Sequence, residues 1–432
     1  MTPIADGWID DAPVQWTRGR IKNLIASSTN GTWGDEPAED GSDVRCIRAA
    51  DFDRVGRRAK VNGAPLRSID ASSLRRHFLH PGDLILEKSG GGEKQPVGMA
   101  VLYEGTEKAV CSNFCSRISP AADVDSRYLT YVFAAAYGQG LTQSAIKQTT
   151  GIQNLDAGVF FSSPWACPGL EEQRRIADFL DAETARIDNL AGLGERQINL
   201  LRERSEALVV QFFGPGEGRR EYRFRHLMES NPCYGVLVPK FADVGVPLIR
   251  VSDLGKLDHD LERLPRIEEE QAQEYKRTRI SPGDLLITVV GATIGRCDVA
   301  PPETAGFNVS RALARVQLAA EISPEMIASW VRGRDFRTQA ELATSGAAAQ
   351  PALNMSDITH FTVWLPETHS GRLDLARRVS THEDETRRLL SAIERKQSLI
   401  AERRQALITA AVTGQFGVTT ASGRNVTDGV TA

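Results

Sequence analysis

The chain has 432 residues, of which 41% are hydrophobic and 25% charged, a composition typical of a folded globular protein with about two to four domains. Its 52 basic and 56 acidic side chains give a formal net charge of −4, which excludes a simple polycation. A nucleic-acid contact would therefore need arginines and lysines gathered on one face. No apolar stretch reaches the roughly 18 residues of a membrane span, and the first sixteen residues hold three aspartates and no basic residue. We expect no signal peptide, no membrane contact and a cytoplasmic protein.

Residues 17–169 alternate short apolar runs with turn residues, which predicts a mixed α/β globule. Residues 80–86 read as a turn that leads into a buried strand. The loop that follows, residues 88–94, contains three consecutive glycines, which would let the backbone approach a phosphate or a base edge. The loop lacks the GxxxxGK[ST] pattern of a Walker loop, and on glycine content alone a plain flexible turn fits better. The flanking lysines and a similar loop in the second half make ligand contact an equal alternative.

Residues 170–213 predict one long helix, because apolar residues return three, four or seven positions apart and charged residues fill the other faces. The apolar stripe consists of Ile176, Leu180, Ile187, Leu190, Ile198, Leu201 and Leu208. One such stripe alone would fit an ordinary core helix. Gly192 and Gly194 lie inside the pattern and each would cost about 1 kcal/mol relative to alanine, which leaves a break or kink open at this point.

The second half of the chain repeats the first at a nearly constant period of about 200 residues. A sequence similar to residues 47–52 recurs at 249–254, and Pro-Gly-Asp-Leu at 81–84 recurs at 282–285. Asn354 is expected to correspond to Asn154. A second long helical pattern, residues 372–415, matches the first but is about three residues shorter, at the position of the two glycines. We therefore predict a globule (1–169), a long helix (170–213), a second globule (214–371), a second long helix (372–415) and a disordered tail (416–432).

No complete catalytic or metal-binding set is found in the sequence. The Asn-Pro-Cys-Tyr sequence at residues 231–234 is close to the Asn-Pro-Pro-Tyr element of amino-methyltransferases, but no glycine-rich strand-to-helix turn precedes it, so a turn is the better interpretation. The Glu-Arg-Lys sequence at residues 394–396 contains a nuclease-like Glu-x-Lys within a helix and fits a solvated charged face. The six cysteines are scattered and are expected to be reduced thiols.

Basic residues are grouped in both globules, and arginine and lysine can bind phosphates or contact guanine with two hydrogen bonds. Each group alone is more often solvated surface, but a set in each half favours paired DNA contacts. The candidate DNA-binding residues are Arg54, Arg57, Arg58, Lys88, Ser89, Gly90, Gly91, Lys94, Lys147 and Gln148 in the first half, and Lys276, Arg277, Arg279, Thr293 and Arg296 in the second. The segments 148–151 and 346–350 are second-rank candidates.

Over nearly its whole length the sequence resembles the specificity subunit of type I restriction-modification systems. The resemblance is carried by Leu-Glu-Glu-Gln-Arg-Arg-Ile at 170–176 with Phe-Leu-Asp at 179–181, by both Pro-Gly-Asp-Leu turns, by Gly-Ala-Thr-Ile-Gly at 291–295, and by the ending at 407–415. The second helix departs from this pattern, because Asp-Leu-Ala-Arg-Arg at 374–378 stands where the first has Glu-Glu-Gln-Arg-Arg.

The resemblance implies an α+β fold of two tandem repeats, each a target-recognition domain followed by a long helix, with the two helices paired as an antiparallel coiled coil. It implies a non-catalytic subunit that reads a split site in double-stranded DNA and docks methyltransferase subunits, two of them being expected. S-adenosylmethionine would then bind the partner methyltransferase and no cofactor would bind this chain; restriction or translocase subunits could join the complex. A rival from another class is a coiled-coil scaffold of a defence complex that reads no bases itself. An autonomous methyltransferase or nuclease would need a cofactor or metal motif that we do not find.

Overall fold

The computed structural model describes residues 8–92, 95–149, 151–257, 259, 261–345, 351–415 and 417–418. The chain divides into two compact units: the first unit combines Met1–Gly194 with Arg395–Ala432, and the second unit is Glu195–Glu394. Within the described residues, no helix is both long and apolar enough to cross a membrane. Apart from residues 417 and 418, the predicted tail lies outside the described residues.

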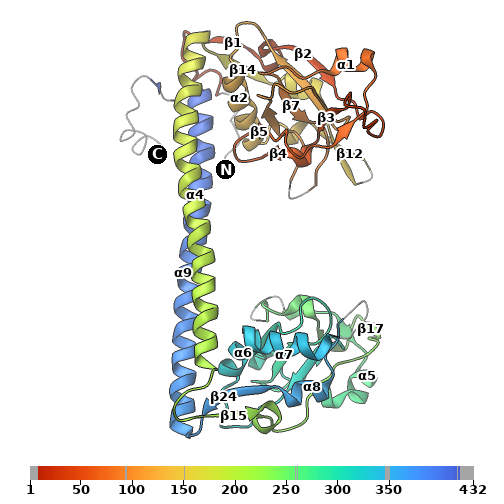
Figure 1. Ribbon diagram of the computed structural model, residues 1–432, viewed down its shortest axis with the longest axis vertical. Coiled ribbons are helices and arrows are strands. Elements are labelled where there is room, and N and C mark those ends of the chain that lie inside the picture. The colour runs from red at the N-terminus through yellow and green to blue at the C-terminus, as the bar shows by residue number, and fades with distance from the viewer. Residues whose placement is uncertain are drawn as a thin grey trace. The chain divides into compact units, whose positions relative to one another are not determined.

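Among its described residues the first unit contains four sheets and, besides the long helices, three short α-helices (Figure 1). The largest sheet has the strand order β2-β11-β7-β9-β5-β4: Ile25–Asn30, Cys115–Pro120, Leu84–Glu87, Ala100–Leu102, Arg58–Ala59 and Phe52–Asp53. The others are β10-β3-β6 (Ala109–Cys111, Val44–Ile47, Leu66–Arg67), β12-β13-β8 (Ile146–Thr149, Ile152–Leu155, Ser89–Gly90) and β1-β14 (Thr17–Arg20, Pro164–Cys167). The helices are α1 (Ala71–His77), α2 (Ser126–Gly138) and α3 (Ala157–Phe161).

Strand β7 is buried on both faces, which fits its run of three apolar residues before Glu87. Side chains alternate along a strand, so Leu84 and Leu86 join one apolar cluster while Ile85 joins another. The first of these clusters also contains residues of α2, which begins after the N-cap Asp125. Figure 1 shows α2 next to α4. The core of the globule therefore continues into the first long helix.

The second unit is also a mixed α/β globule, as the sequence predicts. Its sheets are β16-β23-β20-β21 (Cys233–Tyr234, Leu313–Val316, Leu285–Thr288, Cys297–Val299), β17-β19-β18-β22 (Phe241–Ala242, Arg266–Ile267, Val246–Ile249, Asn308–Val309) and β15-β24 (Arg219–Arg223, Thr362–Pro366). Its short helices are α5 (Glu269–Glu274), α6 (Pro324–Arg332), α7 (Arg334–Thr344) and α8 (Met355–His360). Edge-on aromatic contacts of 5.1–5.2 Å fill its core, joining Phe224, Trp330, Phe336 and Phe361.

Two long helices account for the amphipathic patterns: α4 spans Leu170–Phe212 and α9 spans His369–Val412. Helix α4 is continuous through both glycines, so the break left open by the sequence does not occur. A Cβ atom on Gly194 would lie 1.8 Å from Nε2 of Gln397, whereas a Cβ on Gly192 would meet nothing within 4 Å. Gln397 uses that space to donate to Ala191 O at 2.8 Å. Gly194 is therefore explained by the close approach of a side chain from α9.

Within each unit α4 and α9 contact each other and run in opposite directions. In the first unit Arg404 Nε donates to Asp188 Oδ1 at 2.8 Å, while Gln397, earlier in α9, reaches Ala191, later in α4. In the second unit Ser205 Oγ lies 2.9 Å from His382 Nε2. The Arg378 guanidinium stands 5.3 Å from the centre of the Phe212 ring. These contacts are what two antiparallel helices require.

A short arginine-aspartate turn occurs in both units. In the first, Arg48 donates from its backbone N and its Nε to Asp51, both at 2.9 Å, around the 3-10 turn Ala49–Asp51. In the second, Arg250 donates to Asp253 in the same way at 2.9 and 3.1 Å. The two sequences at 47–52 and 249–254 therefore form the same local structure.

The Pro-Gly-Asp turns also correspond. Asp83 Oδ2 accepts from His80 N at 2.8 Å, and Asp284 Oδ2 accepts from Ser281 N at 2.6 Å. The glycine of each turn has a left-handed φ, +96° in the first unit and +84° in the second, which other residues rarely adopt. The Pro-Gly-Asp order shared by the two units thus has a backbone cause in each of them.

One predicted correspondence is wrong by two residues. Leu155 N donates to Lys88 O and Leu353 N donates to Val289 O, both at 2.8 Å. The residue after each leucine is the N-cap of a helix, Asp156 for α3 and Asn354 for α8. Asn354 therefore corresponds to Asp156 and not to Asn154. The reason is that the segment from Val289 to Leu353 is shorter than the segment from Lys88 to Leu155.

Candidate nucleic-acid interface

The start of the glycine-rich loop in the first unit is fixed by the neighbouring turn. Lys88 N and Ser89 N both donate to Phe114 O, at 2.9 and 3.1 Å. The Lys88 side chain donates from Nζ to Asn30 Oδ1 at 2.9 Å. Lys88 and Ser89 are only partly exposed, so the first two loop residues are held in place by the globule.

The glycines of the loop meet a conformational requirement. Gly90 and Gly91 have left-handed φ values of +114° and +61°. A Cβ on Gly91 would also lie 2.9 Å from Gln95 O, so a side chain would clash with the returning backbone. The described part of the loop is therefore a turn with a defined backbone conformation that requires glycine. Lys94 lies outside the described residues.

A three-stranded sheet brings the loop together with the second-rank segment. Strand β13 pairs with β8 on one side, where Gln153 faces Gly90, and with β12 on the other, where Gln153 faces Gln148. Lys147 Nζ binds Asp156 Oδ2 at 2.7 Å, and this hydrogen bond lowers the pKa of the Asp156 carboxyl. The sequence did not predict that Gly90 and Gln148 lie in one sheet, because the strands β8 and β12 that carry them are about 60 residues apart along the chain.

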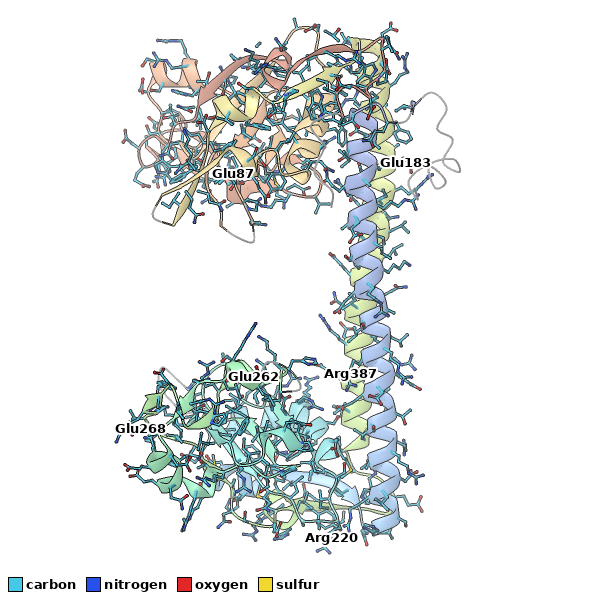
Figure 2. All side chains as sticks on the ribbon, turned by 180° about the vertical axis from the view of Figure 1, so that it is seen from behind. Glu87, Glu183, Arg220, Glu262, Glu268 and Arg387 are labelled. Carbon is cyan, nitrogen blue, oxygen red and sulfur yellow. The ribbon has the colours of Figure 1, made fainter. Side chains whose placement is uncertain are left out.

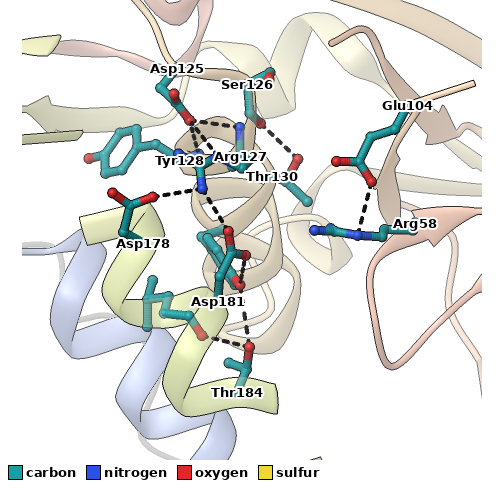
Figure 3. A network of polar contacts seen from close by, with 12 residues as sticks. Arg58, Glu104, Asp125, Ser126, Arg127, Tyr128, Thr130, Asp178, Asp181 and Thr184 are labelled. Carbon is teal, nitrogen blue, oxygen red and sulfur yellow. Dashed lines mark hydrogen bonds and ion pairs between the residues drawn. The ribbon is translucent and has the colours of Figure 1, made fainter. Parts of the chain in front are cut away.

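The three predicted arginines near residue 55 do not form one basic surface. Arg54 Nη2 lies 3.7 Å from Oε1 of Glu87, which Figure 2 labels in the first globule. Arg58 Nε lies 3.0 Å from Glu104 Oε2 (Figure 3). Arg57 is only 7% exposed, and its Nε and Nη1 have no hydrogen-bond partner among the described residues. Burial, followed by the nearby positive charge of Arg404, lowers the Arg57 pKa to about 10. Arg57 thus lies inside the fold, which does not fit the surface phosphate contact predicted for it.

In the second unit the predicted turn at Thr293 and Arg296 is exposed. Arg296 N donates to Thr293 O at 3.1 Å, which closes the turn, and the Arg296 side chain donates from Nη2 to Leu254 O. The turn therefore packs against the segment that follows the arginine-aspartate turn of this unit. The second-rank segment 346–350 lies outside the described residues.

The other predicted basic group of the second unit is a 3-10 turn, Lys276–Thr278, with exposed Lys276 and Arg277 side chains. Arg277 O accepts hydrogen bonds from Cys233 Sγ and Arg315 Nη1, at 3.2 and 3.0 Å. Arg279 Nη2 pairs with Glu269 Oε1 at 3.0 Å. These contacts run to Cys233, Arg315 and Glu269, whereas the Arg296 side chain is held by Leu254.

The Asn-Pro-Cys-Tyr sequence has a structural role. Cys233 and Tyr234 form β16, which pairs with β23, and Tyr234 OH donates to Leu353 O at 2.8 Å. A group of three metal-ligating side chains is not found among the described residues.

An ion-pair network that the sequence reasoning did not single out attaches α2 to α4 (Figure 3). Arg127 Nη1 donates to Asp178 Oδ1 at 2.8 Å and to Asp181 Oδ2 at 2.9 Å. Tyr131 OH donates to the other oxygen of Asp181 at 2.7 Å and lies 3.3 Å from Thr184 Oγ1. The spacing of these residues in the sequence did not predict the network, because arginine and aspartate on helices usually face solvent.

The Glu-Gln pair that begins α4 is part of the same attachment. Gln173 is 2% exposed, and its Nε2 donates to Asp123 O and Pro168 O, at 3.1 and 2.9 Å. Its Oε1 accepts from the backbone N of Asp125, the N-cap of α2, at 2.9 Å. Glu172 Oε1 accepts from Trp16 Nε1 at 3.1 Å. The pair thus orients the globule on the helix.

A pocket of about 450 Å³ opens beside the glycine-rich loop and was also missed by the sequence reasoning. Its lining includes Trp33, Arg48, Glu87, Ser89, Gly90 and Phe114. Burial raises the pKa of the Glu87 carboxyl, and Arg54 opposes this effect. Glu87 is the last residue of an apolar strand, so its sequence position indicated only that the strand ends there.

Comparisons with known proteins agree on one family. The chain is 30% identical over 335 residues to the type I restriction enzyme EcoBI specificity subunit of Escherichia coli, covering 70% of this chain and 67% of that protein. Its fold is similar to a chain in a structure described as the basis of complex assembly and conformational transition of the type I R-M system, with a TM-score of 0.72, 17% identity, and 94% of this chain and 99% of that one covered. The HsdS subunit from Thermoanaerobacter tengcongensis gives a TM-score of 0.53 at 18% identity, over 94% of this chain and 98% of that one. No family model matches the chain.

Proposed function

The chain belongs to the specificity subunits of type I restriction-modification systems, and on this premise we propose that it reads a split site in double-stranded DNA without catalysing a reaction itself. Each globule, followed by its long helix, is one of two tandem repeats and acts as a target-recognition domain for one half-site. The proposed domains are residues 1–169 and 214–371, with helical spacers at 170–213 and 372–415.

The observation that carries this proposal is the recurrence of the same local structures in both units. Each unit has an arginine-aspartate turn, a Pro-Gly-Asp turn with a left-handed glycine, and a loop leading back to a leucine that precedes a helix N-cap. The structures between these landmarks differ, as two readers of different half-sites require. Two equivalent frames with different contents favour paired recognition over a scaffold.

In the first unit we propose that the interface consists of the loop at residues 88–94 and the strand carrying Lys147 and Gln148, which one sheet connects. In the second unit the exposed turn at Thr293 and Arg296 and the basic residues at 276, 277 and 279 are the candidates. Arginines and lysines would position the DNA through its phosphates, and the loops would read base edges.

The long helices would set the distance between half-sites. The 43 residues of α4 correspond to about 64 Å at 1.5 Å per residue, which exceeds the roughly 34–36 Å of one B-DNA turn. The antiparallel contacts between α4 and α9 in each unit support a coiled coil. Because the repeats would give the helix pair an approximate two-fold symmetry, it would present equivalent surfaces to two methyltransferase subunits. S-adenosylmethionine would bind those subunits, and restriction or translocase subunits would join them for cleavage.

The test is single-molecule sequencing of modified bases in a methylation-free host. The host would express this chain with its neighbouring methyltransferase gene, and the control would express the methyltransferase alone. We expect a split motif of two short half-sites, methylated on adenine only when this chain is present. If both proteins fold and associate but no new methylation appears, the scaffold interpretation replaces this one.

A further inference from the structure

The pocket beside the glycine-rich loop combines an aromatic rim with a buried carboxylate. Trp33 lies in its lining, and Phe114, which is 49% exposed, lies there as well. The backbone of Phe114 holds the first residues of the loop, so the Phe114 backbone and the start of the loop are fixed relative to each other. The pocket is therefore continuous with the segment proposed to contact DNA.

Among the described residues that line this pocket, Glu87 has a buried carboxylate oxygen without a hydrogen-bond partner. It is 4% exposed, its Oε1 lies 3.7 Å from Arg54 Nη2, and its Oε2 has no hydrogen-bond partner among the described residues. A buried carboxylate oxygen without a donor is costly, and native structures rarely keep one without a reason. A ligand that brings a hydrogen-bond donor to Glu87 would remove this cost.

The charges around the pocket decide which ligand fits. Arg48 is already bound to both oxygens of Asp51, at 2.9 and 3.0 Å, so it is not a free anion-binding group. A phosphate would meet the Glu87 carboxylate at close range and be repelled. A flat ring with an amino group satisfies both features, because the ring can pack on Phe114 while the amino group donates to Glu87.

We propose that this pocket receives the major-groove edge of a nucleobase whose exocyclic amino group lies in that groove, adenine or cytosine, from the half-site read by the first unit, and that Glu87 accepts a hydrogen bond from that amino group. Acidic side chains accept from the cytosine amino group in known DNA contacts. This inference rests on the proposed function and assigns to Glu87 one position of the first half-site. Arg54 is a positioning residue, since it holds one carboxylate oxygen and leaves the other for the base.

The experiment uses the assembled complex of this chain with its methyltransferase subunits and DNA duplexes that contain its own split motif. In each duplex one adenine or cytosine of the first half-site is replaced by purine or pyrimidin-2-one, which lack the amino group. We measure binding by wild type, by Glu87→Met, which removes both acceptor oxygens, and by Phe114→Ala. Glu107→Gln serves as the matched control, because Glu107 is an exposed carboxylate of the same globule outside the pocket.

At one position of the first half-site, wild type and Glu107→Gln should bind the substituted duplex about tenfold more weakly than the unmodified one. Glu87→Met should bind the two duplexes with similar affinity, while its discrimination in the second half-site stays unchanged. A uniform loss of affinity for every duplex, or no position with this behaviour, would overturn the inference. If the Glu87→Met complex does not assemble, Phe114→Ala decides, since it must reduce discrimination at one position only. A wild-type complex that yields no split motif would instead refute the proposed function.

Discussion

The attachment of the first globule to α4 can be tested by replacing Gln173 with alanine. The substitution removes three hydrogen bonds to backbone groups, besides a weaker one to Cys167 Sγ at 3.4 Å. It leaves the backbone N of Asp125 and the carbonyls of Asp123 and Pro168 without these partners at a buried site. At about 1 kcal/mol for each lost hydrogen bond, the local opening free energy should fall by about 3 kcal/mol. Because about 1.4 kcal/mol corresponds to a factor of ten in an equilibrium constant, the equilibrium constant for opening at the start of α2 should rise about 100-fold.

Hydrogen exchange followed by mass spectrometry on a peptide that covers Asp125 measures this opening directly. Arg174→Ala is the matched control, because Arg174 is the next residue of α4 and is exposed. We expect fast exchange near Asp125 in Gln173→Ala and wild-type exchange in Arg174→Ala. Equal protection in the two variants would refute the assignment of Gln173 as the residue that holds α2 on α4.

Three further predictions concern the helix glycines, Glu87 and Arg296. Gly192→Ala should raise the unfolding free energy by about 1 kcal/mol in chemical denaturation, whereas Gly194→Ala should gain little because its Cβ displaces Gln397; an equal gain in both would contradict the close approach. The raised pKa of Glu87 means that its protonated form favours the folded state, so wild-type stability should fall as pH rises through that pKa, and Glu87→Gln should flatten this dependence in denaturation curves between pH 4 and 7. Arg296→Ala should weaken binding of the assembled complex to its DNA site and lower the salt slope by about one if Arg296 contacts a phosphate; unchanged affinity would remove Arg296 from the interface.

Much of the fold could be predicted because the relevant signals are local. Apolar residues at helical spacing predict the ranges of α4 and α9 to within three residues at each end. The Pro-Gly-Asp turns were recognisable because a left-handed backbone position selects glycine in both copies. The offsets between copies located the same turns without any knowledge of how the strands pair.

The candidate site was harder to predict because it depends on pairings between distant strands. The loop at Lys88 lies in one sheet with Gln148 only because β13 pairs with both β8 and β12. Arg57 looks like part of a basic turn, yet its left-handed φ of +56° and its burial place it under the surface. Glu87 looks like the polar end of a strand, and its unpaired oxygen is visible only once the surrounding turns are assembled.

The missing Glu-Gln pair of the second helix has a physical explanation in how each globule is attached. In the second unit Leu375 and Val379 of α9 are buried in the apolar core, and burial of such side chains contributes about 1.5–3 kcal/mol each. The ion pair Arg332–Glu383, at 2.7 Å, is partly exposed and contributes about 0–1 kcal/mol. The apolar stripe thus supplies most of the attachment in the second unit, and a buried amide like Gln173 is an addition specific to the first. This accounts for an apolar helical periodicity in both α4 and α9, with a buried polar motif at the start of α4 alone among the described residues.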